Sequence, residues 1–175
     1  MVGKTSLIFK YLNKGNLNDR NPSMDESSMP VLIKTSKGEE KEFKIFDTVE
    51  DEEYQNMLEE WICNANGFIL VFAINDNDSF VNIKNLYNKI KNNNMDKIPI
   101  VLVGNKCDLE EERIIKKQDA QDYAKLIGAH YYETSVMNDE NGNCKNIFQD
   151  CANMIVNKAN AESRQESKCM KCSIF

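Results

Sequence analysis

The chain has 175 residues, of which 41% are hydrophobic and 29% charged, a composition typical of one globular domain with a real core. Its formal net charge of −6 argues against nucleic-acid polymers as partners, because binding to them depends on cationic neutralisation of phosphates. No apolar run approaches the ~18–20 residues of a transmembrane helix, no secretory signal opens the chain, and six cysteines indicate a reducing cytosol rather than a secreted disulfide framework.

The first third of the chain combines helical spacing, a polar stretch and two strand-like runs. The predicted elements are a helix from Lys4, a loop over 13–28, strands over 31–35 and 42–47 around a turn at 36–39, and a helix over 52–65.

The rest of the chain alternates apolar runs of strand length with helical patterns. The predicted elements are a strand over 67–74, a helix from Ser79 as N-cap to 92, a strand over 99–104, a helix over 118–127, a strand over 130–133 and a helix over 143–160. Strands that are apolar on both faces, each followed by a helix, predict an α/β fold with a mostly parallel sheet covered by helices on both faces. We expect a domain over 1–159 and a flexible tail over 160–175.

The sequence Gly3-Lys4-Thr5-Ser6 at the start of a helix matches the second half of a phosphate-binding P-loop. Backbone N–H groups at a helix N-terminus favour anions, a Lys reaches phosphate oxygens, and a Thr hydroxyl ligates Mg²⁺. Taken alone, however, these residues favour an ordinary solvated helix start over a phosphate site.

Two other strand ends carry polar residues that belong with such a site. Asp47 ends one predicted strand, where it is either a turn residue or a Mg²⁺-binding carboxylate. Asn105, Lys106 and Asp108 follow the apolar run 99–104, at the sheet edge where ligands of open α/β sheets bind.

Asn105-Lys-Cys-Asp108 resembles the guanine-recognition motif of the small GTPases, and the resemblance to the Ras subfamily covers roughly residues 2–155. It includes the runs 67–75 and 98–109, Ser79-Phe80 and Glu133-Thr-Ser135. It implies the P-loop small G-protein fold and a guanine-nucleotide-binding signalling switch that hydrolyses GTP to GDP and phosphate with Mg²⁺. Effector and regulatory proteins would bind its switch regions.

The resemblance also assigns roles to individual residues. The phosphate-binding residues would be Gly3, Lys4, Thr5 and Ser6, with Lys4 also catalytic. The Mg²⁺ ligands would be Thr5, Ser23 and, through water, Asp47. The guanine-binding residues would be Asn105, Lys106, Asp108, Ser135 and Val136.

The second switch departs from the family pattern of Ala-Gly-Gln, because this chain has Val49-Glu50-Asp51. Glu50 replaces the Gly whose amide meets the γ-phosphate, and Asp51 stands at the position of the Gln that orients the attacking water. We therefore expect slow or impaired hydrolysis. The alternative is a pseudo-GTPase, a membrane-anchored binding module that does not cycle between nucleotides.

The beginning of the chain lies inside the P-loop pattern. The family places a central strand of about eight residues and a first loop Gly before this point, so we expect a truncated sequence with its first central strand missing and a sheet reduced from six strands to five.

The chain ends in Cys172-Ser-Ile-Phe175, a C-a-a-X box that predicts prenylation of Cys172, and Cys169 is a candidate for palmitoylation. These lipids would place the protein on the cytoplasmic face of a membrane, such as the plasma membrane. The alternative for Cys169 and Cys172 is a redox or zinc pair, which needs a second pair of ligands. The other cysteines are predicted to be structural thiols, and His130 an ordinary half-buried residue.

Overall fold

The computed structural model describes residues 1–12, 28–48, 55–93, 98–139, 142–162 and 170–174. Its helices are α1 (Lys4–Tyr11), α2 (Gln55–Asn64), α3 (Asn77–Asn92), η2 (Glu110–Glu112), α4 (Lys117–Ile127) and α5 (Asn143–Glu162). Its strands are β1 (Ser28–Lys34), β2 (Glu40–Asp47), β3 (Gly67–Ala73), β4 (Ile100–Asn105), β5 (His130–Glu133) and β6 (Met170–Ile174). None of the helices in these ranges is long and apolar enough to cross a membrane.

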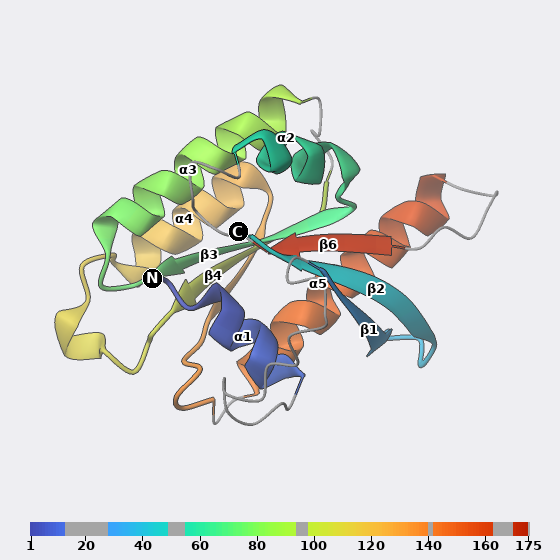
Figure 1. Cartoon of the computed structure of the whole chain (residues 1–175). Coiled ribbons are helices and arrows are strands. Elements are labelled where there is room, and N and C mark those ends of the chain that lie inside the picture. Colours follow the sequence, from blue (N-terminus) through green and yellow to red (C-terminus); the bar gives the residue numbers. More distant parts are fainter. Residues whose placement is uncertain (13–27, 49–54, 94–97, 140–141, 163–169, 175) are drawn as a thin grey trace.

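The strands form one six-stranded sheet in the order β1-β2-β6-β3-β4-β5. Only β1 and β2 pair antiparallel, as expected for two strands joined by a short turn, and the other neighbours pair parallel. Helices α1 and α5 cover one face, and α2, α3 and α4 cover the other (Figure 1). The predicted α/β architecture with helices on both faces is confirmed.

Strand β3 shows why the run 67–73 is apolar throughout. Its side chains alternate between the two faces, so Ile69 and Val71 join the core under α1 and α5, while Phe68 and Leu70 join the core under α2, α3 and α4. Every residue of the strand is buried. A strand covered on both faces needs apolar residues at odd and even positions alike.

Strand β6 is the main difference from the sequence-based expectation. Residues 170–174, predicted as part of a flexible tail, form a strand in the centre of the sheet, and α5 extends to Glu162. The expected five-stranded sheet with an empty central position is therefore wrong: the sheet has six strands, and Figure 1 shows β6 between β2 and β3. The physical reason is that β2 and β3 would otherwise bury unpaired backbone N–H and C=O groups along their facing edges.

The contacts of β6 tie it to both neighbours. It pairs with β2 over five residues, from Phe43 opposite Met170 to Asp47 opposite Ile174, and with β3 over three. Cys172, Ser173 and Ile174 are all at most 3% exposed. The Thr48 hydroxyl donates to the Ile174 carbonyl at 2.6 Å, which anchors the end of the strand.

The start of α3 also differs from the prediction. Asp76 is the N-cap, and its side chain accepts a hydrogen bond from the Ser79 N–H at 3.1 Å. The Ser79 hydroxyl instead accepts from the Ala73 N–H and donates to the Asp76 carbonyl, so it joins the end of β3 to the helix start. Both Asp and Ser are good N-caps, so the local sequence alone does not choose between them.

Two single substitutions in β6 test its contribution to stability. Ile174→Ala removes a side chain that is 0% exposed, and we expect it to lower the free energy of unfolding by about 2–5 kcal/mol. Ser173→Ala is the matched control: within the described part of the chain the buried Ser173 hydroxyl has no hydrogen-bond partner, so its removal should be neutral or stabilising. Thermal and urea denaturation measure both, and equal effects would contradict a buried central β6.

Candidate functional site

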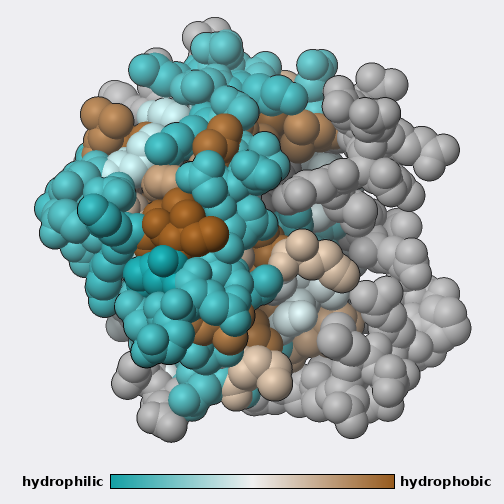
Figure 2. Space-filling model, turned by 90° about the vertical axis from the view of Figure 1, so that its left-hand side faces the viewer, coloured by the Kyte–Doolittle hydropathy of each residue, from teal (hydrophilic) through white to brown (hydrophobic). Residues whose placement is uncertain are grey.

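Those predicted site residues that the structure describes gather at the edge of the sheet where the parallel strands end. The N-terminus of α1 and the segments that follow β2, β4 and β5 all meet there, on the left-hand side of Figure 1. Figure 2 views this end of the molecule directly, where hydrophilic side chains cover most of the described surface and hydrophobic ones form small separate groups.

Gly3 precedes α1 in a conformation that requires glycine. Its φ of 92° is left-handed, and a Cβ there would lie 2.5 Å from Nδ2 of Asn105. The Leu7 N–H donates to the Gly3 carbonyl at 2.9 Å and begins the helical ladder. Lys4, Thr5 and Ser6 form the first turn and are half-buried, so the predicted phosphate residues stand at a helix N-terminus, which carries partial positive charge.

Asn105 links this helix start to the predicted base-binding segment. Its side chain is 2% exposed, and its amide donates to the Val2 carbonyl at 2.8 Å. The two residues are 103 positions apart in the chain. The contact therefore holds the start of α1 against the end of β4.

Thr5 and Asp47, two of the predicted Mg²⁺ ligands, are in direct contact. The Thr5 hydroxyl donates to Oδ2 of Asp47 at 2.6 Å. A hydroxyl and a carboxylate are both oxygen ligands of the kind that Mg²⁺ prefers, so these residues fit the ion. Ser23, the third predicted ligand, lies outside the described residues, as do Glu50 and Asp51.

The predicted base-binding residues lie on two loops that hydrogen-bond to each other. Lys106 has a left-handed φ of 64°, and the N–H of the next residue, Cys107, donates to the Thr134 carbonyl at 3.2 Å. The Ser135 hydroxyl accepts from the backbone N–H groups of Met137 and Asn138 at 3.1 and 3.0 Å. Its direct role is thus to shape the loop after β5.

Asp108 and Val136 complete that set. Asp108 is exposed at the surface, whereas Val136 is half-buried and packs against the core under α1 and α5. An exposed carboxylate beside a structured loop is available to a ligand that offers hydrogen-bond donors.

Comparison with known proteins agrees with this arrangement. A family model described as the Ras family matches residues 1–157.

The chain belongs to the Ras family.

The relatives of this Ras-family chain include both Rab and Ras proteins. It is 32% identical to the rat GTP-binding protein Rab-3D over 170 residues, which cover 91% of this chain and 71% of that protein. It is 31% identical to human Ras-related protein Rab-21, with 93% and 72% covered, and 35% identical to rat Ras-related protein R-Ras, with 77% and 61% covered. The matches establish a small GTPase of the Ras superfamily, whose members bind GTP and GDP, generally with Mg²⁺, and bind effector and regulatory proteins.

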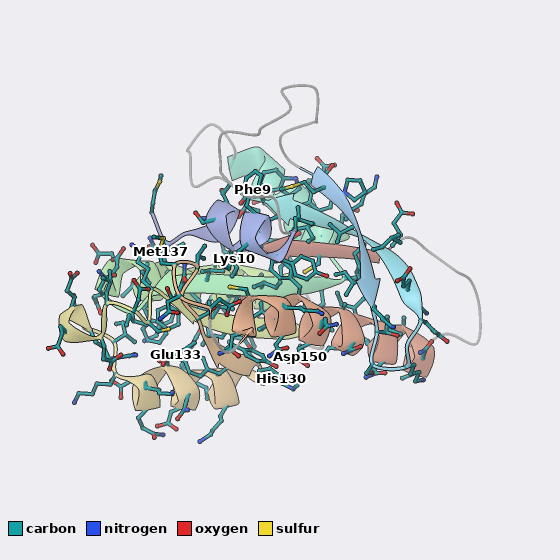
Figure 3. All side chains as sticks on the ribbon, turned by 90° about the horizontal axis from the view of Figure 1, so that it is seen from below. Phe9, Lys10, His130, Glu133, Met137 and Asp150 are labelled. Carbon is teal, nitrogen blue, oxygen red and sulfur yellow. The ribbon has the colours of Figure 1, made fainter. Side chains whose placement is uncertain are left out.

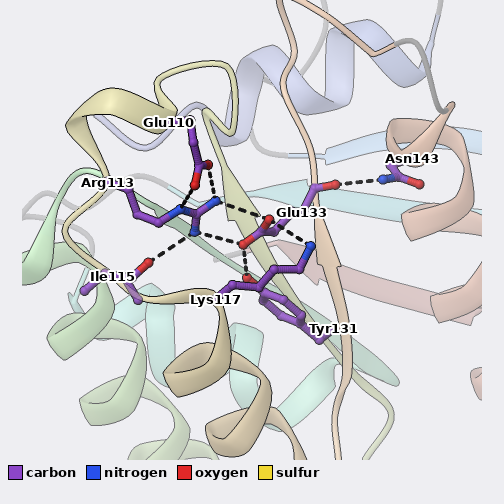
Figure 4. Close-up of polar contacts among 7 residues, drawn as sticks. All are labelled: Glu110, Arg113, Ile115, Lys117, Tyr131, Glu133 and Asn143. Carbon is purple, nitrogen blue, oxygen red and sulfur yellow. Dashed lines mark hydrogen bonds and ion pairs between the residues drawn. The ribbon is translucent and has the colours of Figure 1, made fainter.

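A charged network that the sequence analysis missed supports the loop after β5 of this Ras-family domain (Figure 4). Glu133 accepts hydrogen bonds from Arg113 at 3.0 and 3.3 Å and from the Tyr131 hydroxyl at 2.7 Å. Lys117 lies 3.4 Å from the same carboxylate. Arg113 also makes a two-point contact with Glu110, at 2.8 and 2.6 Å.

The network has clear electrostatic consequences. The carboxylates of Glu110 and Glu133 raise the pKa of Arg113 above its ordinary value, and burial, followed by the bond to Glu133, raises the pKa of Tyr131. Both groups therefore keep their protons at neutral pH. Since Glu133 directly precedes Thr134 and Ser135, the network orients the loop that faces Lys106 and Cys107. No sequence signal connects residues 110, 113 and 133, whose proximity depends on the sheet.

The single histidine makes an ordinary structural contact with α5, as Figure 3 shows, but its side chain is exposed rather than half-buried as predicted, because it stands at the start of β5 on the surface. His130 Nδ1 lies 2.6 Å from Oδ2 of Asp150, which also accepts the Tyr132 hydroxyl at 3.0 Å. Burial, followed by the Asp150 charge, raises the pKa of Tyr132 to about 12. In the described ranges no group of three or more His, Cys, Asp or Glu side chains is placed to hold a metal ion, so nothing there supports a zinc site at Cys172.

The network around Glu133 gives a stability prediction. Arg113→Ala leaves the Glu133 carboxylate, whose side chain is 11% exposed, without its closest cation, and we expect a loss of about 3 kcal/mol in the free energy of unfolding. In the double variant Arg113→Ala/Glu133→Gln the unpaired charge is gone, so about half of the loss should be recovered. Urea denaturation measures both variants. A double variant that is as unstable as Arg113→Ala, or less stable still, would contradict a coupled pair.

Proposed function

We propose that this Ras-family chain is a GTP/GDP-linked signalling switch whose hydrolysis of GTP is slow. The observation that carries the proposal is the bond from the Asn105 amide to the Val2 carbonyl, because it joins the predicted phosphate end and the predicted base end into one site. A single nucleotide would reach from the phosphate end to the base end, and single guanine nucleotides are the ligands of the family.

At the phosphate end, backbone N–H groups of Gly3, Lys4, Thr5 and Ser6 would face the phosphates, and the Lys4 ammonium would balance their charge. Thr5 and Asp47 would hold Mg²⁺, Asp47 through water, together with Ser23. When bound, the ion supplies positive charge that neutralises phosphate oxygens.

At the base end, the exposed Asp108 carboxylate would accept the N1–H and 2-amino donors of guanine. Asn105 and Lys106 would brace and cover the base, and the loop of Ser135 and Val136 would face its O6 edge. Adenine offers no such pair of donors, so it would leave the carboxylate without partners and bind more weakly.

The slow hydrolysis rests on the residues of the second switch. Asp51 is anionic and one methylene shorter than the family's Gln, so it would position the attacking water poorly beside a phosphate of like charge. Glu50 adds a second carboxylate and a Cβ where the family has Gly. The same two residues favour the second candidate, a pseudo-GTPase that uses the domain as a binding module.

The membrane part of the proposal is that Cys172 is prenylated, with Cys169 as a second lipid site, on the cytoplasmic face of a membrane such as the plasma membrane. In the structure the Cys172 side chain is 3% exposed within β6. A prenyl group there would not fit in the sheet. Lipidation and the inserted strand are therefore alternative states of the same residues.

Nucleotide titration tests the switch. Full-length protein freed of nucleotide should bind GDP with a Kd tighter than about 1 µM when Mg²⁺ is present, and bind ADP at least about 100-fold more weakly. Calorimetry or fluorescent GDP measures both. Binding of GDP in the micromolar range or weaker, or without dependence on Mg²⁺, would refute the switch.

The matched control for the base site is Asp108→Asn. Xanthine has a carbonyl where guanine has its 2-amino group, so the Asn amide should lose GDP affinity by about 100-fold and gain affinity for xanthosine diphosphate. A variant that loses both ligands would point to misfolding, which thermal denaturation detects. A variant that keeps full GDP affinity would show that Asp108 does not bind the base.

The proposed cause of slow hydrolysis has its own test. Asp51→Gln should raise the single-turnover rate of GTP hydrolysis by about tenfold or more, because a neutral amide orients water without repelling phosphate. Glu50→Gly alone and the double variant show which residue limits the rate. If the double variant binds GTP with Mg²⁺ yet hydrolyses it no faster than the parent protein, the assignment to these two residues is wrong and the pseudo-GTPase is favoured.

A further inference from the structure

Two thiols that the proposed nucleotide function does not use meet inside the sheet. Cys151 on α5 and Cys172 on β6 are both free, and their Sγ atoms lie 3.4 Å apart. Their exposed fractions are 1% and 3%. They are 21 positions apart in the chain, so the contact joins α5 to the strand at the centre of the sheet.

The packing around Gly67 explains why the sulfurs meet. Gly67 on β3 is the strand partner of Cys172, and a Cβ on Gly67 would lie 3.3 Å from Sγ of Cys151 and 2.7 Å from Cδ1 of Ile155. The missing side chain therefore lets α5 approach the sheet closely at this point. Cys151 occupies the space over the β3–β6 pair.

We propose that Cys151 and Cys172 are an oxidation site that closes to a disulfide and holds β6 in the sheet. The oxidant is a hydroperoxide such as hydrogen peroxide. The Cys172 thiolate attacks the peroxide, takes one oxygen as a sulfenic acid, and releases hydroxide. The Cys151 sulfur then attacks the sulfenic sulfur, and the S–S bond forms as the S–O bond breaks. The sulfenic oxygen leaves as water and takes the thiol proton of Cys151. In sum, two thiols and one peroxide give one disulfide and two waters.

The order of the two steps follows from burial. Both thiols are buried while β6 is inserted, so the packed pair is shielded from peroxide. The shared hydrogen bond and burial also raise the pKa of the Cys151 thiol. In the proposed order β6 first separates from β2 and β3, which exposes Cys172 to the peroxide. A sulfenic acid adds a single oxygen atom, so the oxidised strand can return to Cys151, which completes the reaction.

The disulfide has a consequence for the tail. Cys172 is also the proposed prenylation site, so its oxidation would remove the thiol that a prenyl group needs and would retain the C-terminal strand in the domain. This consequence rests on the proposed membrane function. The disulfide itself depends on neither the nucleotide nor the lipid, and it is measured without them.

Peptide mapping tests the proposal on the full chain. Trypsin cuts after Lys145, Lys158, Lys168 and Lys171, so Cys151 lies on peptide 146–158, Cys172 on 172–175 and Cys169 on 169–171. After treatment with hydrogen peroxide and blocking of free thiols, mass spectrometry should find 146–158 linked to 172–175. A link from 146–158 to 169–171 instead, or no link to 146–158 in the monomer, would overturn the proposal.

Stability and matched variants complete the test. The oxidised monomer should unfold about 5 °C or more above the reduced monomer, because the disulfide closes a loop in the unfolded chain. Cys172→Ser and Cys151→Ser should each abolish that shift, whereas Cys63→Ser, at an exposed cysteine, should keep it. A linked protein with an unchanged or lower Tm, or loss of the link in Cys63→Ser, would contradict a disulfide that holds β6 in place.

Discussion

The rest of the structure depends on the backbone hydrogen bonding at the centre of the sheet. Strands β2 and β3 are both interior strands, and each presents a row of N–H and C=O groups toward the position between them. Buried groups of this kind cost free energy unless they are paired, so something must occupy that position if the two halves of the sheet are to form one domain. In this chain β6, the last strand in chain order, lies between β2 and β3 and pairs with both.

That central strand also organises the candidate nucleotide site. Ile174 pairs with Asp47, and the Thr48 hydroxyl bonds to the Ile174 carbonyl, so β6 fixes the end of β2 from which the proposed Mg²⁺ ligand extends. Thr5 on α1 then reaches Asp47 at 2.6 Å. The predicted phosphate and base segments therefore meet at one edge of the sheet. The strand β6, which pairs with β2 there, is built from the residues that carry the proposed lipidation motif.

Much of this could be predicted from local patterns. The apolar runs at 67–73 and 100–104 are strands because both of their faces are covered, and Gly3-Lys4-Thr5 lies at a helix N-terminus as its chemistry suggests. The strand β6 could not be predicted in this way. Its short sequence, with a lysine and a serine around Cys172, has weak strand character and becomes a strand because two long neighbours lack a partner.

The sequence by itself determined the alternation of helices and strands and the membership of the Ras family, and it supplied the residues proposed to bind a guanine nucleotide. These properties depend on side-chain periodicity and on short motifs, which are local. Only the tertiary structure decided that residues 170–174 stand at the centre of the sheet, that Cys151 meets Cys172, and that Glu133 joins Arg113 and Tyr131 in one network. The physical reason is that strand pairing and burial are satisfied between segments far apart in the chain, and no local pattern specifies which segment will provide the partner.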